Sequence, residues 1–337
     1  MTKYIAAFLS FSSLAIAASY SNPTTLATST TSSTAVSSSS TTAACPSLPS
    51  SLTLISDAKL NDPFTFFNGT KVTTTNDFTC RQAEISTLLQ RYELGILPGP
   101  PTSLTASLSG NTLTITPTVS GKSISFSVTI SYPSSGTAPY PALIAYDGGS
   151  LPAPSGVAII SYSNGDIAAQ DSTSSRGDGK FYTLFGSGHS AGAMTAWAWG
   201  LSRIIDALEN TPSAKIDTTR LGVTGCSRDG KGAMVGGAFD DRIVLTLPQE
   251  SGAGGSASWR ISDYLKSQGA NIQTAEEIVT ENVWFSTAFN PYVNNVSELP
   301  FDHHLLAALI APRGLFVIDN NIDVCIFIFS MITNLIL

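Results

Sequence analysis

A serine between glycines, Ser227, has the surroundings that covalent chemistry needs. It lies in Gly225–Lys231, sequence GCSRDGK, after a partly β-branched segment at 219–224 and before a run of small residues at 232–238. These flanks predict a strand and a helix. A sharp strand-to-helix turn exposes a serine hydroxyl, and the helix N-terminus favours negative charge developing beside it. We therefore predict that Ser227 is a nucleophile.

The predicted turn departs from the usual pattern G-x-S-x-G. Asp229 stands where the last glycine is expected, and Gly230 comes one position later. A loose glycine-flanked serine is also common in plain turns, so its partners must decide between the two interpretations.

A nucleophilic serine needs a base, an acid that orients the base, and donors for the oxyanion. Two carboxylates follow predicted strands, where ligand sites gather: Glu250 comes after 243–247, and Asp319 ends 315–319. Both come after the serine, as the order serine, acid, histidine requires. Position alone favours neither.

The chain has three histidines, and none is well placed to be the base. His189 precedes the nucleophile at a predicted helix start, where a capping or packing role is expected. His303 and His304 follow Glu250, but they open a predicted helix, whereas the base should come from a loop after the last strand.

The pattern of elements predicts one α/β domain. Residues 103–132 alternate apolar and polar side chains, as half-buried antiparallel strands do. From 141–146 onward, apolar strands alternate with helices. This order predicts an α/β-hydrolase fold, a three-layer sandwich with a mostly parallel central sheet and N-terminal antiparallel strands. Residues 147–150 lie where an oxyanion loop is expected.

The composition of the chain and of its first residues predicts where the protein is located and which partners it has. Residues 1–18 resemble a secretory signal peptide, and 19–44 form a Ser/Thr-rich segment, either a flexible linker or a disordered tail. We therefore expect a secreted, extracellular protein. A net charge of −7 argues against nucleic acid and anionic membranes as partners. Four cysteines suggest disulfides, no cluster suggests a metal, and Asn68 and Asn295 begin glycosylation sequons.

Taken with Leu247–Gly252, sequence LPQESG, the serine motif Gly225–Lys231 resembles the fungal glucuronoyl esterases, carbohydrate esterase family 15. Further similar segments are 189–200, 203–209 and 308–315. The family has the α/β-hydrolase fold and its own form of the serine turn, which accounts for the departure at Asp229.

The resemblance implies roles for individual residues. Ser227 would be the nucleophile, Glu250 the acid, and Arg228 would stabilise the oxyanion through its backbone N–H and guanidinium. Sugar hydroxyls would be bound by Lys231, Gln273 and Glu281.

The same resemblance implies the substrate and the disulfides. The substrate would be the ester between 4-O-methyl-glucuronic acid of glucuronoxylan and a lignin alcohol. We expect the enzyme to be a monomer and to need no cofactor. A cationic site suits a uronate. Cys45 would pair with Cys80, and Cys226 with a cysteine beside the catalytic histidine.

The final segment departs from the family, which has a substrate-binding tryptophan and a His-Cys pair after a segment like 318–323. Residues 324–337 are instead apolar, without charge or glycine. Our hypothesis is an unspliced intron, which makes 45–323 an esterase domain incomplete at its C-terminus and 324–337 an aberrant tail. A cDNA that encodes the tail unchanged would refute it.

Two other functions stay open. A generic secreted carboxylesterase or acetyl xylan esterase would use Ser227 but not Lys231, Gln273 and Glu281. An inactive carbohydrate-binding remnant would hold uronic acids without cleaving them.

Overall fold

The computed structural model describes residues 44–319. The chain divides after Ala44, and the account below concerns the unit that begins at Cys45. The predicted signal peptide at 1–18, nearly all of the linker at 19–44 and the tail at 324–337 lie outside the described residues, so those interpretations stay predictions. Within the described part, no helix is long and apolar enough to cross a membrane.

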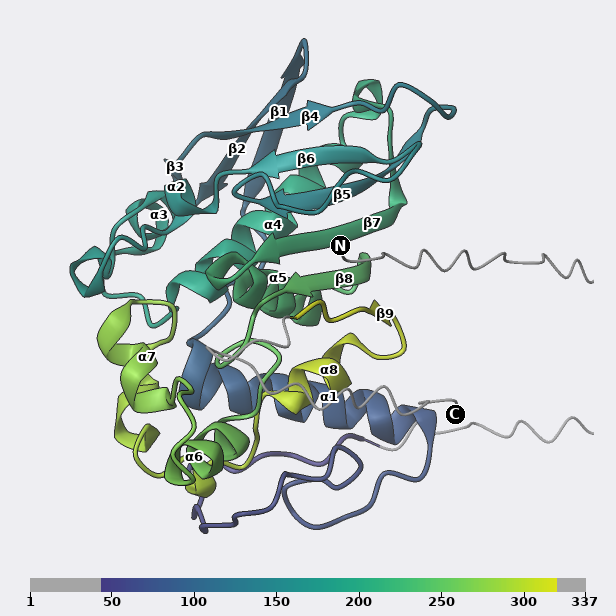
Figure 1. Ribbon diagram of the computed structural model, residues 1–337. Coiled ribbons are helices and arrows are strands. Elements are labelled where there is room, and N and C mark those ends of the chain that lie inside the picture. Colours follow the sequence, from purple (N-terminus) through teal and green to yellow (C-terminus); the bar gives the residue numbers. More distant parts are fainter. Residues whose placement is uncertain (1–43, 320–337) are drawn as a thin grey trace, which may run out of the picture. The chain divides into compact units, whose positions relative to one another are not determined.

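A mixed sheet forms the centre of the unit (Figure 1), with strand order β1-β2-β4-β6-β5-β7-β8-β9 and β3 paired to β2. The pairs from β1 to β6 along this order are antiparallel, and those from β6 to β9 are parallel. The strands are β1 Ser103–Ser109, β2 Thr112–Val119, β3 Lys122–Ser123, β4 Phe126–Ser131, β5 Tyr140–Tyr146, β6 Ala158–Tyr162, β7 Ile216–Cys226, β8 Ile243–Gln249 and β9 Gly314–Leu315.

Helices pack against this sheet, which completes the predicted α/β-hydrolase fold. They are α1 Thr75–Leu89, α2 Asn164–Ile167, α3 Lys180–Phe185, α4 Ala193–Glu209, α5 Arg228–Phe239, α6 Trp259–Ser267, α7 Ala275–Glu281 and α8 His304–Ile310. A π-helical turn, Gln90–Leu94, continues α1. The sequence prediction had no counterpart to α1, and it began α4 four residues early, at His189.

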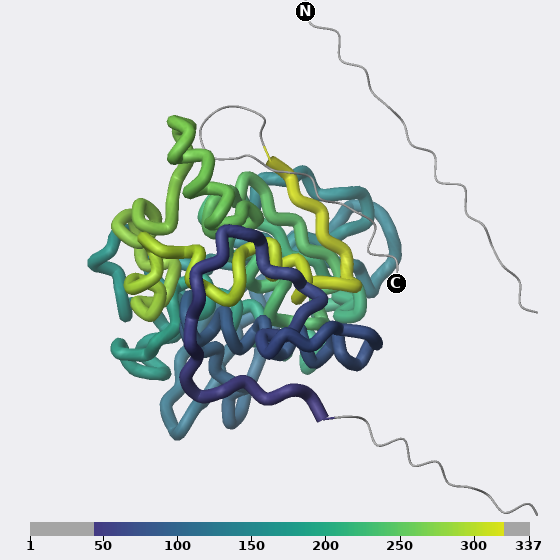
Figure 2. Tube along the Cα trace, turned by 90° about the horizontal axis from the view of Figure 1, so that it is seen from below, coloured from purple at the N-terminus to yellow at the C-terminus, as the bar shows by residue number. Residues whose placement is uncertain are grey.

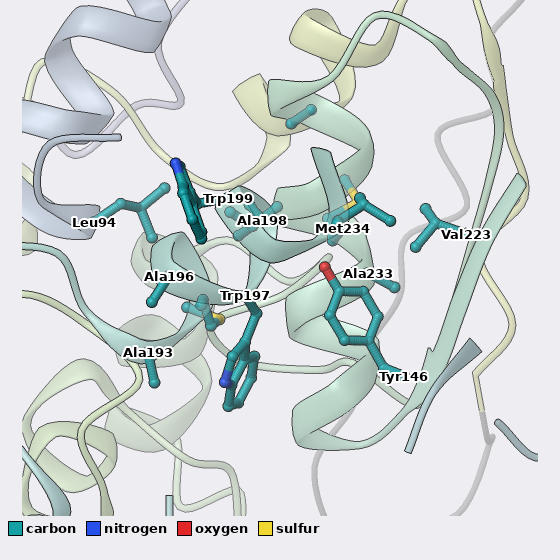
Figure 3. Close-up of a cluster of buried hydrophobic side chains, with 14 of the residues drawn as sticks. Leu94, Tyr146, Ala193, Ala196, Trp197, Ala198, Trp199, Val223, Ala233 and Met234 are labelled. Atoms are coloured by element: carbon teal, nitrogen blue, oxygen red, sulfur yellow. The ribbon is translucent and has the colours of Figure 1, made fainter. Parts of the chain in front are cut away.

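The core explains why α5 is built from small residues. Helix α4 is buried along nearly its whole length; Trp197 lies on the side of Tyr146 (Figure 3), and Trp199 packs against Phe181 and Phe185. A Cβ atom added at Gly232 would lie 2.9 Å from the Trp197 ring. Only glycine therefore lets α5 approach α4 this closely, and this approach fixes the helix that follows Ser227.

An extended N-terminal segment crosses the surface of the unit beside residues 297–301 (Figure 2), and Asp57 N–H donates to the Ser297 carbonyl at 2.9 Å. The predicted disulfide between Cys45 and Cys80 is confirmed and ties this segment to α1. Asn68 and Asn295, the two sequon asparagines, are both exposed. Their glycosylation stays a prediction.

Replacing Asp263 with asparagine is expected to stabilise the protein above pH 6. Burial, with the nearby charge of Asp302, raises the pKa of Asp263 from 3.8 to about 6. A raised folded-state pKa means that ionisation costs stability, so the free energy of unfolding falls as pH rises from about 4 to 6. Allowing for partial exposure, D263N should gain about 1–2 kcal/mol at pH 8 and nothing at pH 3.5 in urea unfolding. An equal gain at both pH values would contradict this origin.

Candidate active site

The turn between β7 and α5 has the geometry of a nucleophile elbow. Ser227 occupies it with φ 59° and ψ −122°, a conformation that non-glycine residues rarely adopt. A Cβ at Gly225 would lie 2.4 Å from the Asp229 carbonyl oxygen, and one at Gly230 would lie 2.3 Å from that of Gln249. Both glycines are therefore needed to make the turn this tight.

Asp229 stands in the place of the usual last glycine and holds the elbow in position. Its Oδ1 accepts a hydrogen bond of 2.8 Å from Nδ2 of Asn164, which is buried at the start of α2. Burial raises the pKa of Asp229, although the Asn164 hydrogen bond opposes the shift. The departure from G-x-S-x-G thus ties the elbow to the segment after β6. Sequence reasoning missed Asn164, because nothing local marks it.

The backbone N–H of Arg228 is available as an oxyanion donor, whereas three amides of the loop after β5 are not. The N–H of Arg228 is the first of α5 and donates to no acceptor among the described residues. The loop after β5 lies where we expected, but three of its amides are engaged. Those of Asp147, Gly148 and Gly149 donate to the carbonyls of Tyr162, Ala145 and Tyr146. In this conformation these amides cannot serve an oxyanion.

Both candidate acids lie at the carboxyl ends of adjacent strands. Glu250 follows β8, and its N–H donates to the Ile318 carbonyl at 2.7 Å, one residue before Asp319. Burial raises the pKa of Asp319 to about 6; the Glu250 charge adds to this, while a Ser256 hydrogen bond and the Lys231 charge oppose it. The predicted strand 315–319 is shorter than expected, since only Gly314–Leu315 is a regular strand.

Lys231 lies one turn into α5 and is buried. Its Nζ donates to the Ser251 carbonyl at 2.6 Å and lies 5.9 Å from the centre of the Trp284 ring. Two walls therefore contact Lys231: the loop 250–258 after β8, and the segment 283–286 after α7. Trp284 was not predicted; no periodicity in its segment distinguishes it from a core residue.

Gln273 lies two residues before α7 and Glu281 is its last residue, and their side chains are hydrogen-bonded to each other. Both are exposed. Glu281 precedes Trp284 by three residues, which places α7 beside the wall that contacts Lys231. Among the described hydrogen bonds, none joins this pair to Ser227 or Lys231.

All three histidines of the chain are described, and each is engaged away from Ser227. The ring of His303 is wholly buried between the Gly255 carbonyl and the Glu93 carboxylate. Nε2 of His304 bonds to the Asn61 carbonyl, and the His189 ring accepts from Ala191 N–H. Cys226 is a free thiol within the described part, and Cys325, in the tail, lies outside it.

A mixed sheet with a strained serine between a strand and a buried helix defines the α/β-hydrolase fold. The sequence profile described as "Glucuronyl esterase, fungi" matches residues 115–331. The chain belongs to this family.

Curated relatives and solved structures of similar sequence belong to the same family. The chain is 73% identical over 281 residues to a 4-O-methyl-glucuronoyl methylesterase of Hypocrea jecorina, covering 83% of this chain and 61% of that protein. The chain is 60% identical over 279 residues to a 4-O-methyl-glucuronoyl methylesterase of Podospora anserina, covering 82% of this chain and 58% of that protein. The chain thus spans about three fifths of the length of these curated relatives.

The catalytic domain of a glucuronoyl esterase from Hypocrea jecorina superimposes with a TM-score of 0.81 at 75% identity, covering 82% of this chain and 76% of that one. A mutant glucuronoyl esterase from Sporotrichum thermophile, solved with methyl 4-O-methyl-β-D-glucopyranuronate, gives 0.79 at 59% identity, covering 80% and 74%.

Proposed function

We propose that this protein is a carboxylic ester hydrolase acting on esters of 4-O-methyl-D-glucuronic acid, with Ser227 as nucleophile. The observation that carries the proposal is the elbow: a strained serine beside an open helix N-terminus, with buried Lys231 one turn away. The named activity of the Hypocrea jecorina relative supports the substrate class. So does the methyl glucuronate ester bound to the Sporotrichum thermophile mutant.

In this proposal Ser227 Oγ attacks the ester carbonyl and gives its proton to a base, which passes that proton to the leaving alcohol as the acyl-enzyme forms. Arg228 stabilises the oxyanion through its backbone N–H and its guanidinium. Water then releases the uronate. Glu250 orients the base that accepts the serine proton, and that base is none of the three histidines in their present positions.

Substrate binding in the proposal rests on three polar residues, Lys231, Gln273 and Glu281. Lys231 Nζ, which lies near the Trp284 ring, meets a ring hydroxyl of the sugar, and Gln273 and Glu281 line the outer side. The finer parts of the proposal are a lignin alcohol as the leaving group, secretion, glycosylation at Asn68 and Asn295, a monomeric state and a catalytic domain at 45–323.

Replacing Lys231 with methionine is expected to weaken binding of methyl 4-O-methyl-β-D-glucopyranuronate about 10–100-fold. The substitution keeps most of the buried stem but removes a charge-assisted hydrogen bond. Titration calorimetry in a Ser227→Ala background, which keeps the ester intact, measures the change. Exposed Lys122→Met is the control and should bind normally. Unchanged affinity in K231M would remove Lys231 from the substrate site.

A generic carboxylesterase is separated from this proposal by substrate preference. Benzyl glucuronate and 4-nitrophenyl acetate are compared at equal enzyme concentration, with Ser227→Ala as the blank. Preference for the acetyl ester would overturn the uronate assignment.

A uronate-binding protein without turnover is the second candidate, and the engagement of all three histidines favours it. It predicts that Ser227→Ala binds the uronate ester as well as the parent chain does, and that the parent releases no alcohol.

A further inference from the structure

The loop 250–258, which contacts Lys231 through the Ser251 carbonyl, folds back on itself. Ser251 Oγ accepts from Ser256 N–H at 3.1 Å, and the Gly255 and Ala257 amides both donate to the Gly252 carbonyl. A Cβ at Gly255 would lie 2.5 Å from that of Ser251, so the turn is closed as tightly as glycine allows. The loop delivers Glu250, the Ser251 carbonyl that receives Lys231, and the Ser256 hydroxyl that donates to Asp319.

The Gly255 carbonyl accepts a hydrogen bond from a buried side chain, that of His303. His303 Nδ1 lies 2.8 Å from this oxygen. Because a carbonyl can only accept, Nδ1 carries the hydrogen. The opposite nitrogen, Nε2, lies 2.5 Å from Oε1 of Glu93, and both side chains are wholly buried.

Glu93 is itself held from two sides. Its Oε1 also accepts from Trp259 Nε1 at 2.9 Å. Its backbone carbonyl accepts from Ser286 N–H at 2.8 Å, which fixes the segment that presents Trp284. The Glu93–His303 pair therefore connects to both walls that contact Lys231.

We propose that His303 is a positioning residue for the uronate site: through its hydrogen bond to the Gly255 carbonyl it fixes the loop 250–258, and with it Lys231 and Glu250. This inference rests on the proposed function for its consequence in binding. It gives the histidine a role that its chain order, after the serine and the acid, does not suggest. His303 contacts no reacting group, so it acts only through the loop.

Two variants that differ by one methylene test the bond to Gly255. In a Glu93→Gln background the 93–303 pair itself carries no carboxylate, and the amide can still bond to His303 Nε2. Asparagine at position 303 places its amide where Nδ1 lies and keeps the bond to Gly255; glutamine reaches position 93 instead and loses it. Both double variants are compared with E93Q alone.

We expect E93Q and E93Q/H303N to bind methyl 4-O-methyl-β-D-glucopyranuronate equally, in the Ser227→Ala background, and E93Q/H303Q to bind at least about fivefold more weakly. Deuterium exchange of peptides spanning 250–258 should accelerate at least about tenfold in E93Q/H303Q only, with β1–β4 unchanged. Circular dichroism confirms that each variant is folded.

Equal affinity and equal exchange in the two double variants would overturn the positioning role, as would an equal loss in both. If the parent chain binds no uronate ester, the proposed function fails, but exchange of 250–258 still decides whether His303 fixes the loop. Should E93Q/H303Q not fold, His303→Gln with Glu93 intact gives the same comparison against His303→Asn.

Discussion

In its 337-residue form, the chain is expected to hydrolyse benzyl glucuronate at least about a thousandfold more slowly than its 73% identical Hypocrea jecorina relative. The reason is the position of its histidines. His303 and His304 bond to Gly255 and Asn61, and His189 lies against the Phe181 and Phe185 rings. With no base to take its proton, Ser227 keeps only the oxyanion donor and substrate binding.

Imidazole in solution should recover part of the activity. A small base in solution can take up a position beside Ser227 and accept its proton, so Ser227-dependent turnover is expected to rise at least about tenfold with imidazole. Initial rates of benzyl alcohol release, followed at constant pH and ionic strength, measure this. Ser227→Ala is the control, because imidazole also hydrolyses esters unaided, and only the difference between the two chains counts.

Activity near that of the relative without imidazole would show that one of the three histidines reaches Ser227, and the inference from their hydrogen bonds would be wrong. Absence of any Ser227-dependent rate, with intact uronate binding, would favour the binding protein over the esterase.

The elbow could be predicted from the sequence because its determinants are local. A strand, a serine, nearby glycines and a small-residue helix are adjacent in the chain, and each leaves its own pattern. The same holds for the alternation that marks β2 and β4. The fold class followed from the order of such segments.

The walls of the site could not be predicted, because they depend on contacts between distant segments. Asn164 meets Asp229 across 65 positions, and His303 meets Glu93 across 210. Neither pair leaves a periodic signal. For His303 the chain order suggested a base, and only burial between two acceptors shows that it has another partner.

The largest stability effect is expected from Asp302, the buried carboxylate next to His303. Its two oxygens accept from the backbone amides of Trp259, Arg260 and His303, at 2.7, 3.1 and 2.7 Å. Asp302 thus satisfies the first amides of α6 from a different element. It also pairs with the buried guanidinium of Arg260 at 3.3 Å.

Replacing Asp302 with alanine should lower the free energy of unfolding by about 3–5 kcal/mol, because the Arg260 charge and the α6 amides stay buried without their partner. Urea unfolding at pH 6 measures the loss. Asp302→Asn keeps an acceptor of the same shape and should lose less, since only the charge and one acceptor disappear.

Asp241, whose side chain is 94% exposed beside Arg313, is the matched control, and Asp241→Ala should leave the midpoint nearly unchanged. Equal midpoints for D302A and D241A would mean that α6 is not held by Asp302. In that case the hydrogen bonds from Arg260 to the carbonyls of Phe301 and Leu299 would be enough to hold its guanidinium without Asp302.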